Sequence, residues 1–250
     1  MLVLLALQSA ASGQSSPAAA QPALTTDQIV AQLVQRNQDR AALLKHYESC
    51  RYYSIDYVGF PSDKSAEMQV DMHFSAPAQK EFRIIKQHGS RLLLDHVLEE
   101  LIQTEKEALD KPNLGRTDLT PSNYEFRLIG TDTIAGVPQY VLAVAPRFKS
   151  KFLYRGRIWV DANDFAVSRV SAQPAKNPSF WISHTDIEHE YQKIGEFWLP
   201  ARNTSVAHVR FGGTARLTIE YRDYRIGDAQ PGAAYGICDE LAGAQISQRK

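Results

Sequence analysis

Hydrophobic residues recur at intervals of three and four along the first part of the chain. They are Ile29, Val30, Leu33, Val34, Ala41 and Leu44. Thr25 and Gln28 stand just before this run at the spacing of a capping box, in which each side chain bonds the other's backbone N–H. The pattern predicts an amphipathic helix over about 26–47, with one face that another element must cover.

From Arg51 onward the spacing changes to two, which is the period of β-strands. Two inward faces are predicted, formed by Tyr53, Ile55 and Tyr57 and then by Met68, Val70, Met72 and Phe74. A third strand is expected at about 80–88, and a second amphipathic helix follows to about 109. That helix should bury Leu94, Val97, Leu98, Leu101, Ile102 and Leu109 and leave Glu99, Glu100, Glu105, Lys106 and Glu107 mostly outside.

The rest of the chain is predicted to be strands joined by short turns. We place them at about 123–131, 137–146, 152–161, 165–173, 180–192, 196–211 and 214–226. About ten antiparallel strands with two helices give a mainly β, α+β fold, either a barrel or a strongly coiled sheet. In the last three strands the hydrophobic residues share one parity, so the concave side is expected to be apolar along its whole length. A barrel this wide needs its helices or a ligand to fill it.

Nine inward-facing residues are therefore the candidates for lining a ligand cavity. They are Tyr53, Ile55, Tyr57, Met68, Val70, Met72, Phe74, Tyr154 and Ile158. The alternative is that they pack only against the two helices. Between two predicted strands, residues 174–181 present Phe180 and Trp181, which would form the rim of the cavity or dock a partner.

The two ends of the chain differ in composition from the middle. Residues 1–20 combine a short apolar run with small, uncharged residues, which predicts a signal peptide and export to the periplasm. We expect one domain over 21–250, with a poorly ordered tail from about 228. In an oxidising compartment Cys50 and Cys238 have each other as the only intramolecular partner, so they form either a disulfide or two unrelated buried thiols.

Charge and motifs exclude several functions. Lys plus Arg and Asp plus Glu each number 28, so no global field favours nucleic acid. His184 and Asp186 share one strand face and His189 lies on the other, which argues against a metal site. One basic cluster, either a solvated hairpin or a surface for anionic groups, consists of Arg147, Lys149, Lys151, Arg155 and Arg157. Nucleophile, phosphate-loop and zinc-protease motifs are missing, so we expect no enzyme activity, cofactor or metal.

Several segments resemble the periplasmic lipoprotein-carrier superfamily of LolA, LolB and RseB-like proteins. They are the runs 140–146, 158–161, 165–169 and 197–200, and 154–161 with 174–181 resembles the branch called outer membrane lipoprotein-sorting protein. The likeness is good over about 122–226. It implies an unclosed β-barrel with a helical lid, whose concave face shelters acyl chains. It also implies a cavity arginine that holds the lid, which the sequence alone does not identify.

The combined expectation is an exported binding or carrier protein that holds a lipid or a lipoprotein acyl chain in a half-barrel. Its partners would be a lipid or an acylated lipoprotein, with a further envelope protein as a possible contact, and the protein would be monomeric and not membrane-spanning. The alternative is a non-enzymatic interaction or sensor module whose cavity is filled by its own side chains and which binds a protein partner.

Overall fold

The computed structural model describes residues 24–177, 182–210, 212–227 and 237–238. The predicted signal peptide, Phe180 and Trp181, and most of the predicted C-terminal tail lie outside these residues. No helix in the described ranges combines the length and the apolarity needed to cross a membrane.

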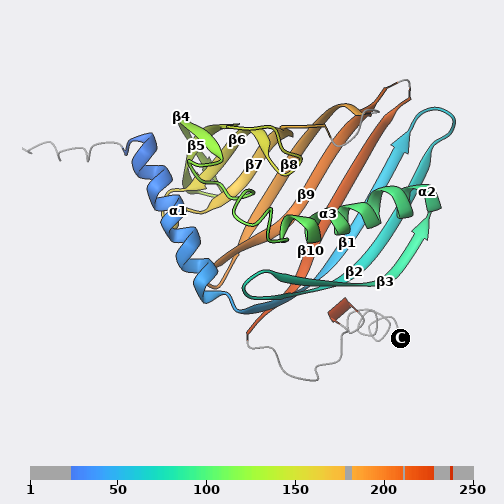
Figure 1. Cartoon of the computed structure of the whole chain (residues 1–250), viewed down its shortest axis with the longest axis horizontal. Coiled ribbons are helices and arrows are strands. Elements are labelled where there is room, and N and C mark those ends of the chain that lie inside the picture. The colour runs from blue at the N-terminus through green and yellow to red at the C-terminus, as the bar shows by residue number, and fades with distance from the viewer. Residues whose placement is uncertain (1–23, 178–181, 211, 228–236, 239–250) are drawn as a thin grey trace, which may run out of the picture.

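Ten strands in the described part of the chain form one antiparallel sheet. Their bounds are β1 His46–Val58, β2 Lys64–Ser75, β3 Gln79–Gly89, β4 Tyr124–Ile134, β5 Val137–Pro146, β6 Tyr154–Asp161, β7 Val167–Pro174, β8 Ile182–Ile194, β9 Phe197–Val209 and β10 Thr214–Ile226. In space they follow the order β3-β2-β1-β10-β9-β8-β7-β6-β5-β4, so β3 and β4 are the two edges and the barrel is not closed. Figure 1 shows how strongly the sheet curves at the β1–β3 end. The predicted fold class is confirmed.

Helix α1 (Thr26–Leu43) starts with the expected capping box. The Gln28 N–H donates to Thr25 Oγ1 at 3.3 Å, and the Thr25 N–H donates to Gln28 Oε1 at 2.9 Å. The helix ends before the predicted residue 47, and β1 begins at His46, not at Arg51. Cross-strand pairing explains the difference, because His46 already lies opposite Ser75 of β2 and the chain must be extended there.

The second predicted helix is one helical run with a wider turn in its middle. It consists of α2 (Arg91–Leu93), the π-helical η1 (Leu94–Leu98) and α3 (Glu99–Ala108). We call residues 91–108 the α2–α3 segment. In Figure 1 it crosses in front of β10, β1 and β2, whereas α1 lies at the other end of the sheet.

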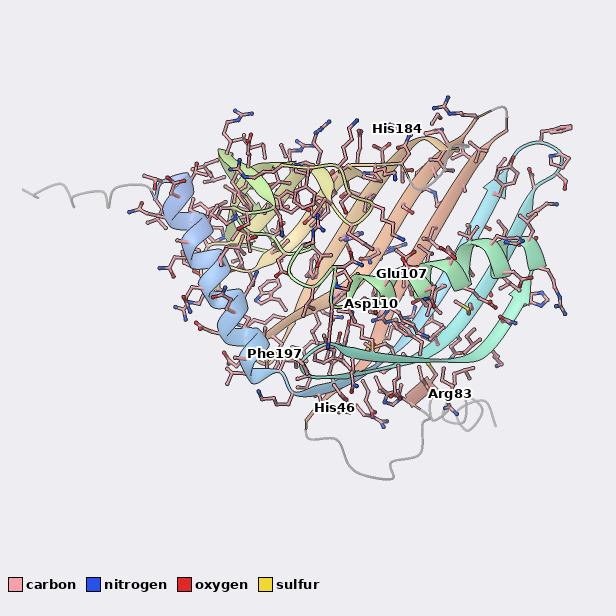
Figure 2. The ribbon with its side chains drawn as sticks, viewed as in Figure 1. His46, Arg83, Glu107, Asp110, His184 and Phe197 are labelled. Atoms are coloured by element: carbon pink, nitrogen blue, oxygen red, sulfur yellow. A yellow bond between two sulfur atoms is a disulfide. The ribbon has the colours of Figure 1, made fainter. Side chains whose placement is uncertain are left out.

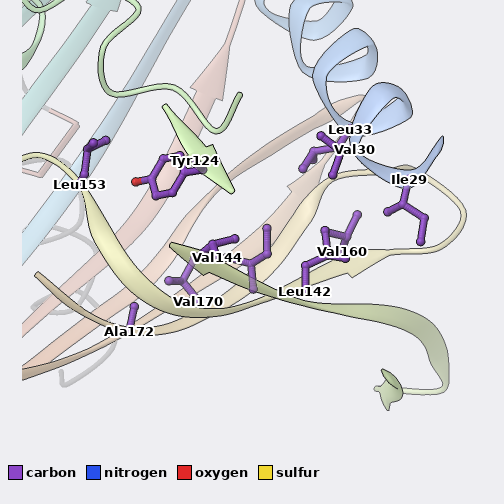
Figure 3. Packing of buried hydrophobic residues seen from close by; sticks show 11 residues of the cluster. Ile29, Val30, Leu33, Tyr124, Leu142, Val144, Leu153, Val160, Val170 and Ala172 are labelled. Carbon is purple, nitrogen blue, oxygen red and sulfur yellow. The ribbon is translucent and has the colours of Figure 1, made fainter. Parts of the chain in front are cut away.

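Each helical element covers its own apolar cluster on the sheet. The cluster at α1 contains three residues of the helix itself, Ile29, Val30 and Leu33. Beneath them lie Tyr124, Leu142, Val144, Leu153, Ile158, Val160, Val170 and Ala172; Figure 3 shows this packing. The cluster at the α2–α3 segment contains Leu93, Leu94, Leu98 and Ile102 of the segment itself. Beneath them lie Tyr53, Ile55, Ala66, Met68, Val70, Ile219 and Tyr221. Burial of this apolar surface, at roughly 25 cal/mol per Å², holds both elements against the concave face.

On the opposite, convex face a disulfide joins Cys50 of β1 to Cys238, with 5.2 Å between the two Cα atoms. Ile237 and Cys238 are buried there against Tyr52 and Ile85. The Cys238 N–H also donates to the buried Asp71 carboxylate at 2.9 Å. Ile237 and Cys238 are thus held on the outside of the sheet by a covalent bond, a hydrogen bond and apolar packing.

Candidate functional site

The strand register aligns one row of concave-face residues across most of the sheet, because directly opposite residues on paired strands share a face. Starting at β2 the row reads Met68, Tyr53, Ile219, Asn203, His189, Val170, Ile158 and Leu142. Its two ends are apolar and belong to the two clusters under the helical elements. Its centre is the polar pair Asn203 and His189.

The centre of the concave face, between the two helical elements, is more polar than the sequence pattern predicted. We call it the central strip, made of Thr185, Ile187, His189, Asn203, Ser205 and Leu217. Five of these residues are half-buried and Thr185 is buried. The expectation of a concave side apolar along its whole length is therefore wrong. The expectation rested on apolar residues such as Leu199 and Val209 at the two ends of β9, but the inward positions between them hold Asn203 and Ser205.

Three buried polar atoms on the concave face have no hydrogen-bond partner among the described residues. They are Ser49 Oγ, Arg51 Nε and Thr185 Oγ1. Buried polar groups in folded proteins are nearly always bonded, and each exception leaves a donor or acceptor that a bound polar group or water can satisfy. The concave face thus combines large apolar areas with a few unsatisfied polar atoms.

Arg51 on β1 is the most deeply buried charged residue of this face, with 2% of its side chain exposed. Its Nη1 donates to Glu105 Oε2 of α3 at 2.7 Å, and its Nη2 donates to Glu105 Oε1 at 3.3 Å. Lys80 Nζ of β3 donates to the same carboxylate at 2.6 Å. The guanidinium also stacks on the rings of Phe82 and Tyr221, with 5.2 and 4.9 Å to their centroids.

The pKa values of this group follow from its geometry. Burial alone would raise the pKa of Glu105, but the charges of Arg51 and Lys80 outweigh it and lower the pKa to about 2. Burial likewise disfavours the charged form of Arg51, yet the Glu105 carboxylate raises the pKa of Arg51 above its ordinary value. Arg51 and Glu105 are therefore both charged at neutral pH, and their ionic contact ties α3 to the sheet.

The position of Glu105 corrects the sequence prediction, which placed it on the solvent side of its helix. Its side chain is 30% exposed, and it turns toward the sheet because it pairs there with Arg51 and Lys80. A signal was present in the sequence: Arg51 has the same parity as Tyr53 and Ile55, so it had to point inward, and a buried arginine needs an acidic partner.

The nine predicted cavity residues separate into three places. Tyr53, Ile55, Tyr57, Met68 and Val70 pack beneath the α2–α3 segment. Met72 and Phe74 pack with Tyr47 and Leu199, whereas Tyr154 and Ile158 pack beneath α1. The structure thus gathers five of the nine under one helical element and fills the space with the protein's own side chains. Their role as ligand contacts stays a prediction.

The polar clusters singled out in the sequence do not form a site on this face. His184 Nε2 and Asp186 Oδ1 are 3.0 Å apart and exposed, whereas His189 is on the concave side, so the three do not converge. In the basic cluster Arg147 pairs with Glu125 at 3.1 Å and Lys151 with Glu107 at 2.5 Å. Exposed pairs of this kind contribute at most about 1 kcal/mol to stability.

His189 gives the central strip a pH dependence. Burial lowers the pKa of His189 from 6.5 to about 4, so the folded protein keeps the ring neutral while the unfolded chain protonates it below 6.5. Stability from this residue is complete above pH 6.5 and is lost as pH falls toward 4. We expect a loss of about 2 kcal/mol, reduced from the full shift because the side chain is only half-buried.

The measurement is urea unfolding of the protein and of His189→Leu between pH 7 and pH 4. Only the difference between the two curves reports on His189, because other groups titrate in the same range. The difference should favour the leucine variant increasingly as the pH falls. A difference that does not change with pH would contradict the assignment of a neutral, buried imidazole.

The solved structures with a similar fold include three from bacteria. A DUF1329 family protein from Desulfovibrio piger has 13% identity and a TM-score of 0.42, covering 85% of this chain and 97% of that one. A LolA superfamily protein from Nitrosomonas europaea has 13% identity and a TM-score of 0.40, covering 86% and 98%. A putative outer membrane lipoprotein-sorting protein domain from Vibrio parahaemolyticus has 10% identity and a TM-score of 0.38, covering 84% and 97%.

The sequence comparisons give no family. No protein-family model matches the chain. No curated protein matches it either. The fold class therefore rests on the open ten-stranded sheet and its two helical elements.

Proposed function

We propose that the protein is an exported, non-enzymatic binding protein that holds an acyl chain between the concave face and the α2–α3 segment. The observation that carries this proposal is the combination under that segment. A large apolar cluster is covered by a helix that one fixed ionic contact, from Glu105 to Arg51 and Lys80, ties to the sheet. Arg51 would then serve as the lid-holding arginine that the sequence resemblance implied.

Binding would exchange one set of apolar contacts for another. When the α2–α3 segment moves away, it uncovers Tyr53, Ile55 and Met68, and a hydrocarbon chain can replace Leu94, Leu98 and Ile102 against them. Each buried CH₂ group contributes about 0.8 kcal/mol, so a long acyl chain offsets the roughly 3 kcal/mol needed to break a buried ion pair. Met68 adapts to flexible chains because its side chain is unbranched.

The central strip would bind the polar end of the ligand. It adjoins the apolar cluster directly, since Ile219 lies opposite Asn203, which in turn lies opposite His189 in the same row. The neutral imidazole and the amide can donate to a carboxylate, ester or amide oxygen. Such a surface suits an amphiphile with one chain and a small polar head.

One observation favours a second candidate function, that of a module that only binds another envelope protein. All of the clusters around the nine candidate residues are closed by the protein's own side chains in this structure. A module that only binds another envelope protein would keep them closed permanently.

Two neighbouring substitutions on β9 distinguish these functions. Ser205 lies on the concave face opposite Ile187 and Leu217, whereas Val206 points to the convex face opposite Asp186. If the groove binds acyl chains, Ser205→Trp should weaken binding of a fluorescent fatty acid by about tenfold or more, and Val206→Trp should leave it unchanged. The titration uses the full-length mature protein at pH 7.

Native mass spectrometry of the protein purified from its own host is the second readout. Co-purified lipid that is lost in Ser205→Trp and kept in Val206→Trp supports the carrier. Absence of lipid together with no binding of the fluorescent fatty acid would overturn it and leave the interaction module.

A further inference from the structure

Two histidines and one glutamate come together on the convex face, away from the site described above. His46 and Glu48 are two residues apart on β1 and therefore share a face. His73 of β2 lies directly opposite Glu48 in the strand register. All three positions are thus fixed by backbone pairing between adjacent strands, at the end of β1 that follows α1.

The donor atoms of the three side chains converge. His73 Nδ1 is 3.0 Å from Glu48 Oε1, and His46 Nε2 is 3.5 Å from the same oxygen. One donor atom from each residue lies within 4.8 Å of the other two. In a tetrahedral zinc site with bonds of about 2.0–2.1 Å, neighbouring donor atoms are roughly 3.3 Å apart. Small side-chain rotations bring the three atoms to that spacing.

A second group orients one of the imidazoles. His46 Nδ1 is 3.3 Å from Ser75 Oγ, and Ser75 is the register partner of His46. With the Nδ1 proton donated to that hydroxyl, the lone pair of Nε2 faces Glu48. Histidine ligands in metal sites are commonly oriented by a hydrogen bond of this kind from their other ring nitrogen.

Partial burial makes the cluster more than a set of surface charges. The side chains of His46, Glu48 and His73 are 14, 20 and 12% exposed. Bulk water therefore competes less for their donor atoms, while one side stays accessible for a fourth ligand. Two imidazoles and one carboxylate form a donor set used by catalytic zinc sites, in which water completes the coordination. Mg²⁺ and Ca²⁺ prefer oxygen ligands and fit it poorly.

We propose that His46, Glu48 and His73 form a binding site for a divalent transition-metal ion such as Zn²⁺, with water as the remaining ligand. The ion bridges β1 and β2 at the point where the chain leaves α1. It binds the folded protein in preference to the unfolded chain, because the three ligands come from two strands that meet only in the fold. Metal binding therefore stabilises the protein.

The competing explanation is a cluster in which the carboxylate only accepts hydrogen bonds from the two imidazole rings. The two explanations differ in stoichiometry and in metal selectivity. A cluster that forms only hydrogen bonds would not bind one equivalent of Zn²⁺, and it would not prefer Zn²⁺ to Mg²⁺.

The test is calorimetric titration of Zn²⁺ into the untagged, oxidised, EDTA-treated full-length mature protein at pH 7.5. We expect one equivalent to bind with a Kd of about 10 µM or lower, while Mg²⁺ does not bind. His46→Ala, His73→Ala and Glu48→Gln should each weaken binding by about tenfold or more. Zn²⁺ should raise the melting temperature of the unsubstituted protein and not that of His73→Ala.

The matched control is His184→Ala. His184 also lies 3.0 Å from a carboxylate, that of Asp186, but Figure 2 places it at the top of the view, at the other end of the strands from His46. This variant should keep full Zn²⁺ affinity. The proposal is overturned if the unsubstituted protein binds no Zn²⁺ below about 100 µM, or if the three site variants bind it as tightly as the control. Glu48→Gln keeps the shape of the side chain, so one of the variants remains informative if an alanine variant unfolds.

Discussion

The Cys50→Ala/Cys238→Ala protein is expected to have a free energy of unfolding about 5 kcal/mol lower than that of the oxidised protein. The two cysteines are 188 residues apart, so the disulfide closes nearly the whole folded chain into one loop and restricts the unfolded state strongly. The same bond holds Ile237 over β1 and β3. Urea unfolding under oxidising conditions measures the difference.

Chemical reduction separates the covalent effect from the loss of two buried sulfurs. A reducing agent should bring the unsubstituted protein down to nearly the stability of the double variant and should leave the variant itself unchanged. Equal stability of the oxidised and the reduced protein would show that Ile237 and Cys238 are held by Asp71 and apolar packing, not by the disulfide.

Glu105→Ala is expected to lower the free energy of unfolding by about 3 kcal/mol, because it leaves the buried Arg51 guanidinium without its carboxylate. Glu107→Ala is the matched control: it removes a carboxylate on the same helix that pairs with Lys151 at the surface, and should cost less than about 1 kcal/mol. Urea unfolding of the two variants at pH 7 makes the comparison. Similar losses would contradict the structural role given to the buried pair.

The pH dependence provides an independent check on Glu105. Its pKa falls from 4.5 in the unfolded chain to about 2 in the fold, so its stabilising contribution is complete above pH 4.5 and disappears as pH falls toward 2. This loss follows that of His189, whose contribution disappears between pH 6.5 and 4. In Glu105→Ala the loss of stability between pH 4.5 and 2 should be missing, and the loss between pH 6.5 and 4 should remain.

The Glu105 contact also tests the proposed function. If the α2–α3 segment must move for an acyl chain to enter, Glu105→Ala should admit the fluorescent fatty acid faster than the unsubstituted protein does. Stopped-flow mixing gives the rate. Unchanged entry would place the binding route elsewhere on the concave face.

The strands could be predicted well because their signal is local. Alternation with a period of two, bounded by turn residues, gave 137–146 and 214–226 with the bounds of β5 and β10. The junction between α1 and β1 failed for a physical reason. Ala41 and Leu44 continue the helical spacing, but the pairing of His46 with Ser75 comes from a distant strand and decides the conformation.

The candidate site was predictable only where a single strand carries the information. Parity placed Tyr53, Ile55, Met68 and Val70 inward, and these four are buried together under one helical element. The ion pair between Arg51 and Glu105 was missed because each residue alone resembles an ordinary surface charge, and their partnership spans 54 residues. The convex cluster of His46, Glu48 and His73 was missed because only the register between two strands brings it together.

The strand order has a consequence for how the molecule forms. β1 is paired on one side with β2, its neighbour in sequence, and on the other with β10, the last strand of the sheet. The strand groups β1–β3 and β4–β9 can assemble early from local contacts, but the seam that joins them is β10 (214–226), which must pair with both β1 and β9. Non-local pairings of this kind slow folding, because bringing two distant segments together costs loop-closure entropy before their contacts can form. Until the seam closes, β1 and β9 each present an open edge to other chains, a hazard that ends only when the final strand arrives.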